Sequence, residues 1–258
     1  MTNPVLALNE QIVLVTGGAR GLGAAISRAF LSQGAKVVIN YYQSKDLAQQ
    51  LAGEYPDNAV AIKADIRDRA QVDEMFAQAA QHFGTPVTTV VNNALVDFAF
   101  NGDARSHADV ISYEELAAQF SGSIQGPLNI IQAALPGMKD ASFGRVINIG
   151  TNLFQNPVVP YHDYTASKAA LLSLTRTFAG DLGPAGITVN MVSGGLLRTT
   201  DASAATPEEV FDAIAAGTPL GAVTTPEQLA DTVVFFASPW ARGVTGQNLI
   251  VDGGLVRD

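Results

Sequence analysis

Hydrophobic and polar positions form two kinds of segment along the chain. Short runs rich in β-branched residues are apolar at almost every position, which is typical of strands buried on both faces of a parallel sheet. These runs lie at residues 11–16, 36–40, 59–63, 87–92, 144–150, 187–192 and 247–252. Longer amphipathic stretches with helical periodicity separate them, among them residues 23–33, 70–83 and 164–182. The pattern therefore predicts strands and helices in alternation.

This alternation predicts an α/β fold, a doubly wound (Rossmann) parallel sheet with helices on both faces. The 258 residues suffice for one large core, and no linker or repeat interrupts them, so residues 1–258 are expected to form a single domain that binds a dinucleotide and carries the catalytic site. Two stretches, 95–112 and 194–207, break the rhythm, and loops of that length are often functional, here as substrate loops. Ser112 and Glu115 have capping-box spacing, so a helix is expected to begin there.

Composition excludes several classes of function. The net charge is −9, and no cluster of lysine and arginine suggests a nucleic acid or an anionic membrane as partner. No apolar run reaches spanning length and no signal pattern begins the chain, so a cytoplasmic protein is expected. Cysteine is absent and His82, His107 and His162 lie far apart in sequence, so no metal site is expected. Catalysis must then use hydroxyls, lysines, carboxylates or a bound organic cofactor.

A glycine-rich segment, "TGGARGLG" at residues 16–23, follows the first expected strand. Gly17, Gly21 and Gly23 permit a tight turn and a close approach of the backbone, with the N-terminus of the next helix facing a phosphate. Glycine-rich turns also occur for purely structural reasons. The position after the first strand of a parallel sheet favours a dinucleotide-binding turn.

The end of the second expected strand bears on the choice of cofactor. In dinucleotide folds an acid there binds the ribose hydroxyls and favours NAD. Tyr41 occupies that place, and residues 40–44 contain no Asp or Glu. Arg20 in the glycine turn and Ser44 nearby suit the 2′-phosphate of NADP, so NADP(H) is expected as the preferred cofactor, with NAD(H) as the alternative. Arg20 is otherwise a surface residue at the start of a helix.

The segment "YHDYTASK" places Tyr161, Tyr164 and Lys168 on one face of a helix. Thr151 follows the strand at 144–150, at the edge of the sheet where ligands bind in this architecture. Taken alone, the set fits a tyrosine–lysine pair on a helix surface equally well.

Several motifs in the same order resemble the short-chain dehydrogenase/reductase family. They are "TGGARGLG", "AD" at 64–65, "NNA" at 92–94, "YTASK" at 164–168 and "VTGQNLIVDGG" at 244–254. The resemblance covers residues 10–255 and is strongest to 3-oxoacyl-[acyl-carrier-protein] reductases. In that family a serine or threonine lies thirteen residues before the catalytic tyrosine, and a lysine lies four after it. Thr151, Tyr164 and Lys168 match this pattern, whereas Tyr161 does not and is expected at the helix entry or in the pocket wall.

The resemblance implies a role for each of these residues. Tyr164 would protonate a carbonyl oxygen as hydride arrives, and Thr151 would hydrogen-bond that oxygen. Lys168 would hold the nicotinamide ribose and, with the nicotinamide charge, lower the pKa of Tyr164 from about 10 by about 2 units. The cofactor-binding residues implied are Gly17, Arg20, Gly21, Leu22, Gly23, Tyr41, Ser44, Asp65, Ile66, Asn93, Ala94, Tyr164, Lys168, Gly194, Leu196 and Thr199.

Three positions depart from the family pattern. Leu95 replaces the glycine of "NNAG", and Ser193 replaces a proline that fixes φ near the nicotinamide. Ser123 occupies the place of an asparagine thought to hold a proton-relay water, on an expected helix over 119–138. Serine is shorter, so the relay would need another water or a local adjustment of the helix.

The leading hypothesis is an NADP(H)-dependent carbonyl reductase or alcohol dehydrogenase acting on a small ketone or a 3-oxoacyl thioester. Apolar residues 96–100, 152–154 and 158–161 are expected to line the pocket. Arg105, Lys139 and Arg145 are isolated in the sequence and are expected to be solvated, so no basic dock for an acidic carrier protein is predicted. The alternative is a non-catalytic dinucleotide-binding sensor or scaffold. By resemblance, a homotetramer is expected.

Overall fold

A single sheet organises the computed structural model, which describes residues 4–98, 100–101, 104–200, 203–204 and 206–257. Within these residues its seven parallel strands lie in the order β3-β2-β1-β4-β5-β6-β7. The strands are β1 (Ile12–Val15), β2 (Lys36–Tyr41), β3 (Ala59–Lys63), β4 (Thr89–Asn92), β5 (Gly144–Thr151), β6 (Ile187–Gly194) and β7 (Asn248–Val251). The predicted doubly wound α/β fold is confirmed.

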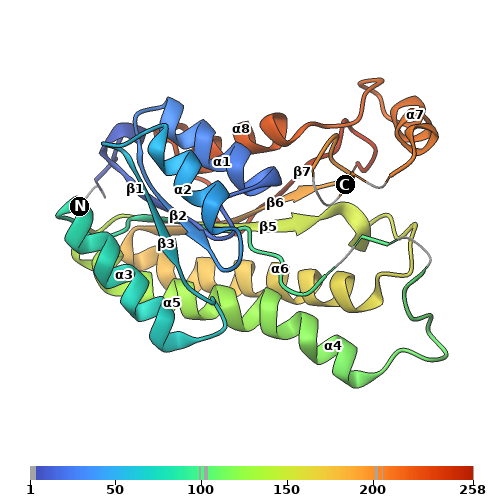
Figure 1. Cartoon of the computed structure of the whole chain (residues 1–258), viewed down its shortest axis with the longest axis horizontal. Coiled ribbons are helices and arrows are strands. Elements are labelled where there is room, and N and C mark those ends of the chain that lie inside the picture. The colour runs from blue at the N-terminus through green and yellow to red at the C-terminus, as the bar shows by residue number, and fades with distance from the viewer. Residues whose placement is uncertain (1–3, 99, 102–103, 201–202, 205, 258) are drawn as a thin grey trace.

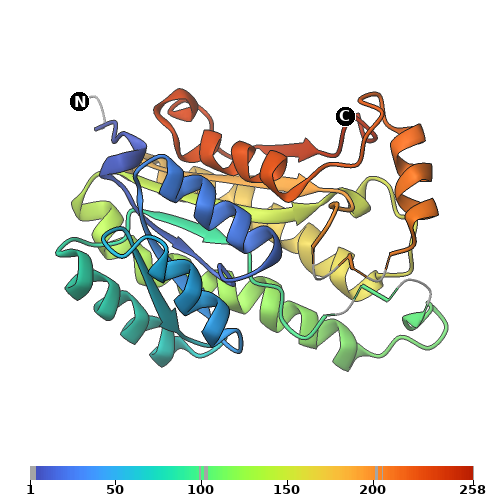
Figure 2. The same cartoon turned by 45° about the horizontal axis from the view of Figure 1, so that its top comes forward.

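Helices cover both faces of this sheet (Figures 1 and 2). One face carries α1 (Gly21–Ser32), α2 (Lys45–Gly53) and α8 (Pro226–Ala237). The other carries α3 (Arg69–Phe83), α5 (Gly126–Asp140) and α6 (His162–Leu182), with α4 (Tyr113–Phe120) extending beyond the sheet. The helix α7 (Glu208–Gly217) lies toward the carboxyl ends of the strands, and short 3-10 turns lie at Leu8–Glu10, Asn152–Phe154, Gly183–Ala185 and Pro239–Ala241. No helix among the described residues is long and apolar enough to cross a bilayer.

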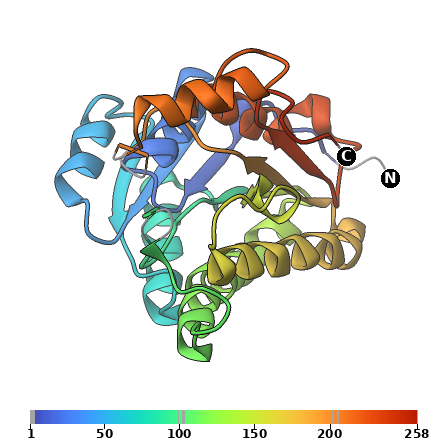
Figure 3. The same cartoon turned by 90° about the vertical axis from the view of Figure 1, so that its right-hand side faces the viewer.

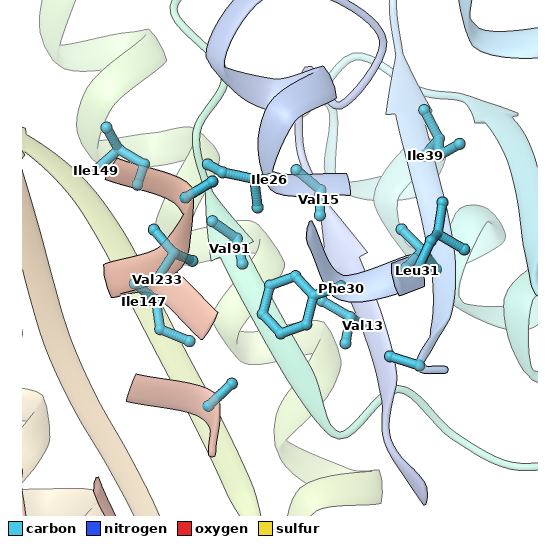
Figure 4. Packing of buried hydrophobic residues seen from close by; sticks show 14 of the residues in the cluster. Val13, Val15, Ile26, Phe30, Leu31, Ile39, Val91, Ile147, Ile149 and Val233 are labelled. Atoms are coloured by element: carbon cyan, nitrogen blue, oxygen red, sulfur yellow. The ribbon is translucent and has the colours of Figure 1, made fainter. Parts of the chain in front are cut away.

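Alternation within each strand divides the core into two layers, because successive side chains point to opposite faces. Val13 and Val15 pack with α1 and α8, whereas Ile12 and Leu14 pack with α3, α5 and α6. Figure 4 shows the first layer, in which Phe30 of α1 lies among strand valines and isoleucines. Continuously apolar strands are therefore required by the two helical layers.

The sheet is built outward from β1: strands β2 and β3 lie on one side of it, and β4 to β7 lie on the other. Strand β1 pairs with β2 on one side and with β4 on the other. Connections from the two central strands leave toward opposite faces, which opens a crevice beside their carboxyl ends. Figure 3 views the molecule from the side toward which β5 and β6 point.

The helix expected over 119–138 is interrupted. A π-helical turn, Ser121–Gln125, lies between α4 and α5. Upstream, the predicted capping box is confirmed, since Ser112 N donates to Glu115 Oε2 at 2.8 Å and Glu115 N donates to Ser112 Oγ at 3.2 Å. A π-helical turn accommodates one extra residue and often marks a functional site.

Replacement of Phe30 by alanine tests the first core layer. Phe30 is fully buried, so Phe30→Ala should lower the free energy of unfolding by about 3 to 5 kcal/mol. Urea denaturation followed by circular dichroism measures this change. Phe235→Ala removes a phenylalanine that is 36% exposed and should cost much less. Equal losses in the two variants would contradict the assignment of Phe30 to the core.

Candidate active site

The glycine turn forms a backbone cradle between β1 and α1. Gly17 has φ +59° and Gly21 has φ +50°, values in the left-handed region that favours glycine. A Cβ atom on Gly23 would lie 2.0 Å from the carbonyl oxygen of Gly17, so only glycine permits this approach. The N-terminus of α1 therefore lies against the turn with no side chain between them, as a bound pyrophosphate requires.

Polar side chains at the ends of neighbouring strands hold the turn in place. Thr16 Oγ1 accepts hydrogen bonds from Asn93 N at 2.9 Å and from Ala94 N at 3.0 Å, and Asn93 Nδ2 donates to Thr16 O at 2.9 Å. Asn40 Oδ1 accepts from Gly17 N at 3.3 Å. Thr16 and Asn40 were not predicted from the sequence, although each is a polar residue at the end of an apolar strand.

The expected adenosine residues lie beside this turn. Gly18 N donates to Asn40 O at 2.9 Å, which places the turn against the end of β2, where Tyr41 follows. Arg20 is the exposed N-cap residue of α1, and Ser44 is the N-cap residue of α2. Leu22 is half-buried in the first turn of α1. The structure thus brings these residues to one edge of the sheet.

Asp65 has a protein partner that the sequence analysis missed. Its carboxylate accepts hydrogen bonds from Arg67 Nη2 at 2.8 Å and from Arg67 N at 2.9 Å, and the Arg67 side chain lowers the pKa of Asp65. Arg67 Nη1 also donates to Asp97 at 2.9 Å. Ile66 is buried, and its carbonyl accepts from Asn129 Nδ2 at 2.9 Å. Contact of Asp65 and Ile66 with adenine stays a prediction.

Thr151, Tyr164 and Lys168 meet at the carboxyl end of β5. All three are buried, and the Thr151 side chain acts on Tyr164 in the direction that lowers the pKa of the phenol. Lys168 Nζ donates to Ile149 O at 2.7 Å and lies 5.8 Å from the centroid of the Tyr164 ring. The predicted grouping of hydroxyl, phenol and amine is therefore present, because α6 begins directly over the end of β5.

Burial shifts the two ionisable groups in opposite directions. It raises the pKa of Tyr164 to about 12, against the effect of the Thr151 hydrogen bond, and lowers the pKa of Lys168 to about 8. Desolvation disfavours the charged form of each group. The expected lowering of the Tyr164 pKa concerns the site with bound nicotinamide and stays a prediction.

The departures from the family pattern occupy defined places. Ser123 is buried in the π-helical turn, which packs against α6, and its place in a proton relay stays a prediction. Ser193 continues the β6 strand opposite Gly150, and its Oγ donates to Asn248 Oδ1 at 2.7 Å. A proline would bring no N–H to this ladder, so the sheet itself fixes the backbone here. Leu95 follows Ala94 directly after the cofactor edge.

The expected nicotinamide segment leaves the end of β6. Gly194 is its last strand residue, and a Cβ atom there would lie 2.5 Å from Leu229 Cδ1. Leu196 is half-buried and Thr199 is exposed, whereas Thr200 lies beside the glycine turn, 3.5 Å from a Cβ atom built on Gly21. The segment therefore borders the cradle from the side opposite Ala94.

Aromatic rings from the 95–112 loop lie over Tyr164. The ring centroids of Phe98 and Phe100 are 4.7 Å and 5.7 Å from that of Tyr164. Tyr161, at the entry of α6, completes the cluster at 5.3 Å from Phe98. Of the expected apolar lining, Phe98 and Phe100 are therefore in direct contact with the Tyr164 ring, and Tyr161 packs against both phenylalanines.

Two arginines expected at the solvated surface are not there. Arg105 forms an ion pair with the buried Asp163, and its guanidinium lies 4.4 Å from the centroid of the Phe98 ring. Arg145 is buried in β5, donates to Gly144 O at 2.8 Å, and has its pKa lowered to about 10 by burial. Lys139 is exposed as expected.

A cavity of about 370 Å³ opens beside the aromatic cluster, and Tyr161 belongs to both. Its other lining residues are Pro157, Val158, Val159, Pro160, His162 and Thr165. The part of the chain that the structure describes holds no group of three histidine, cysteine or acidic residues able to bind a metal ion.

Comparisons with known proteins agree with this fold. A family model described as enoyl-(acyl carrier protein) reductase matches residues 17–256. The chain is 32% identical to a versicolorin reductase of Emericella nidulans, over 97% of each protein. It is 35% identical to a 3alpha-hydroxysteroid dehydrogenase of Mediterraneibacter gnavus, over 96% of this chain and 98% of the relative. A Serratia marcescens short-chain dehydrogenase/reductase, solved as a double mutant, superposes with a TM-score of 0.84 at 32% identity, covering 97% of this chain and 99% of the other.

A glycine cradle at the switch point of a parallel sheet, with a hydroxyl, phenol and amine at the end of β5, defines an oxidoreductase site. The chain belongs to the short-chain dehydrogenase/reductase family. It is an enzyme, a carbonyl reductase or alcohol dehydrogenase, of a family that binds NAD(H) or NADP(H). The cradle between Gly17, Ala94 and Thr200 fits such a dinucleotide.

The buried lysine predicts a specific pH dependence of stability. Between pH 8 and 10.5 the unfolded Lys168 still binds a proton that the folded one has released, so stability should rise by about 1.4 kcal/mol per pH unit. Lys168→Met should lack this contribution. Urea midpoints of both proteins from pH 7.5 to 9.5 measure the difference, below the range in which tyrosines titrate. Lys139→Met, at an exposed site, should follow the wild type; parallel curves for Lys168→Met would contradict the burial effect.

Proposed function

We propose that this protein is an NADP(H)-dependent oxidoreductase that moves hydride between nicotinamide and a ketone or secondary alcohol. The observation that carries the proposal is the joint burial of Thr151, Tyr164 and Lys168 at the end of β5, with Lys168 Nζ held by Ile149 O and 5.8 Å from the centroid of the Tyr164 ring. The bound nicotinamide supplies or accepts the hydride. The protein supplies the proton, fixes the carbonyl oxygen and excludes water.

Each residue acts at a stated atom. The Tyr164 hydroxyl donates its proton to the carbonyl oxygen while the carbonyl carbon gains hydride, so the product is the alcohol. Thr151 Oγ1 hydrogen-bonds the same oxygen and holds it in line with Tyr164. Lys168, protonated below a pKa of about 8, faces the phenolate that remains and stabilises it. Proton resupply then runs through the region of the π-helical turn that contains Ser123.

The choice of NADP(H) over NAD(H) rests on the adenosine edge. Residues 40–44 contain no carboxylate that would repel a 2′-phosphate. Arg20 stands at the start of α1, where a guanidinium suits a phosphate. Asp65 and Ile66 would meet the adenine, with Arg67 sharing or releasing the Asp65 carboxylate as the adenine binds. NAD(H) remains the comparison cofactor.

Two kinds of ketone fit the site. A 3-oxoacyl thioester follows from the family model, whose description names an acyl carrier protein. A ring-containing ketone is favoured by the aromatic cluster at Tyr164, and the similar proteins are named for versicolorin and a hydroxysteroid. We also propose a homotetramer, which light scattering of the purified protein would measure.

Turnover tests the proposed chemistry directly. The protein should consume NADPH in the presence of an acetoacetyl thioester or 2-tetralone. It should oxidise NADPH faster than it oxidises NADH. Tyr164→Phe should lower kcat by about 100-fold or more, because the proton donor is lost. Absorbance at 340 nm measures the rates, and the cofactor's fluorescence measures binding in the same samples. NADPH binding without turnover of any ketone would favour a non-catalytic sensor or scaffold.

A substitution at the adenosine edge tests cofactor choice. Arg20→Gln should raise the Kd for NADPH by about 10-fold and leave the Kd for NADH almost unchanged, because only NADPH carries the 2′-phosphate. Titration of cofactor fluorescence measures both constants. Arg69→Gln, on the exposed surface of α3, serves as the matched control. Equal weakening of both cofactors by Arg20→Gln would contradict a phosphate contact.

A further inference from the structure

The ring of Tyr164 is covered in part by other aromatic side chains of the protein. Tyr164 is 6% exposed and Thr151 is 4% exposed. Phe98 lies over the Tyr164 ring at an interplanar angle of 31°, and Phe100 packs edge-on to both rings. We call Phe98 and Phe100 the aromatic cover.

Polar contacts fasten this cover on each side. Arg105 binds the cover and the catalytic helix together, since its guanidinium lies over Phe98 and pairs with Asp163, the residue before Tyr164. Next to it, Ser106 Oγ donates to Glu115 Oε1 of α4 at 2.6 Å. Before the cover, Asp97 accepts from Arg67 at 2.9 Å. The rings are therefore held by a set of directed contacts on both sides.

A substrate that reaches the Tyr164 hydroxyl from the side of these rings has to move them. Moving two phenyl groups from a buried cluster exposes apolar area to water, unless the substrate covers them in return. A large, rigid ring system offers enough apolar surface to replace the lost contacts and to stack on the displaced rings. A small polar ketone cannot replace these contacts, so its binding must overcome the whole free-energy cost of displacing the two rings.

We propose that Phe98 and Phe100 determine substrate specificity by covering Tyr164 until a large apolar, ring-containing ketone displaces them. Arg105 is the positioning residue that holds the cover closed through its pair with Asp163. This inference rests on the proposed function and narrows its substrate class from ketones in general to those with fused or bulky rings. Simple acyl thioesters are then poor substrates.

Accessibility of Tyr164 provides a test that needs no turnover. Tetranitromethane nitrates accessible tyrosines, and peptide mass mapping reads each site. In the wild type Tyr164 should be protected, with Tyr113, which is 78% exposed, as the internal reference. Phe98→Ala and Arg105→Gln should each raise the nitration rate of Tyr164 by about 3- to 10-fold, the effect of losing one aromatic or ionic contact.

Matched variants separate the cover from general destabilisation. Phe235→Ala and Arg69→Gln change the same residue types at exposed sites and should leave Tyr164 protected. Arg105→Lys keeps the charge and should restore part of the protection. If Phe98→Ala does not fold, Phe98→Leu takes its place. Equal nitration of Tyr164 in the wild type and all variants would overturn the cover.

Kinetics with two ketones test the specificity role. The wild type should favour 2-tetralone, a fused bicyclic ketone, over 2-butanone. Phe98→Ala should raise kcat/KM for 2-butanone by about 3- to 10-fold and lower it for 2-tetralone, because the cover is lost together with its stacking surface. Turnover with an unchanged ratio of the two substrates would overturn the inference alone. Absence of turnover in every variant would overturn the proposed function and the specificity role together, whereas nitration would still report on the cover.

Discussion

Burial of the parallel sheet on both faces is the constraint on which the rest of the molecule depends. Parallel strands cannot be joined by tight turns, so every connection crosses a face and all carboxyl ends lie along one edge. The reversal of strand order at β1 then leaves a crevice at that edge. The topology brings three elements together at this edge: the glycine turn, Asn93 and the carboxyl end of β5.

Local pattern was enough to predict most of this framework. The apolar runs matched the strands within two residues at each end, and the helices expected at 23–33, 70–83 and 164–182 matched within two residues as well. Periodicity and propensity are properties of neighbouring residues, so the sequence displays them. The π-helical turn was not predicted, because it depends on how α4 and α5 pack together against α6.

The residues of the site also divide into those that local spacing predicted and those that depend on distant contacts. Thr151, Tyr164 and Lys168 were found through fixed spacings, and the structure brings them together. Arg105 was read as solvated because its partner, Asp163, lies 58 positions further along the chain, and no local pattern joins the two. Arg67 was missed for a different reason. It lies two residues from Asp65, but a charged residue in a loop gives no sign of which way it turns.

The raised pKa of Tyr164 and the contacts of its ring have one cause. The same burial that disfavours the phenolate is produced in part by Phe98 and Phe100, which keep water from the ring. Displacement of these rings would therefore change the environment of the Tyr164 hydroxyl. Pairing of Lys168 with a developing phenolate gains strength in a site from which water is excluded. The proposed chemistry requires access to the Tyr164 hydroxyl and a site free of water. A bulky substrate that moves the cover and then fills the space meets both requirements. A small ketone would reach the hydroxyl but leave water in the site.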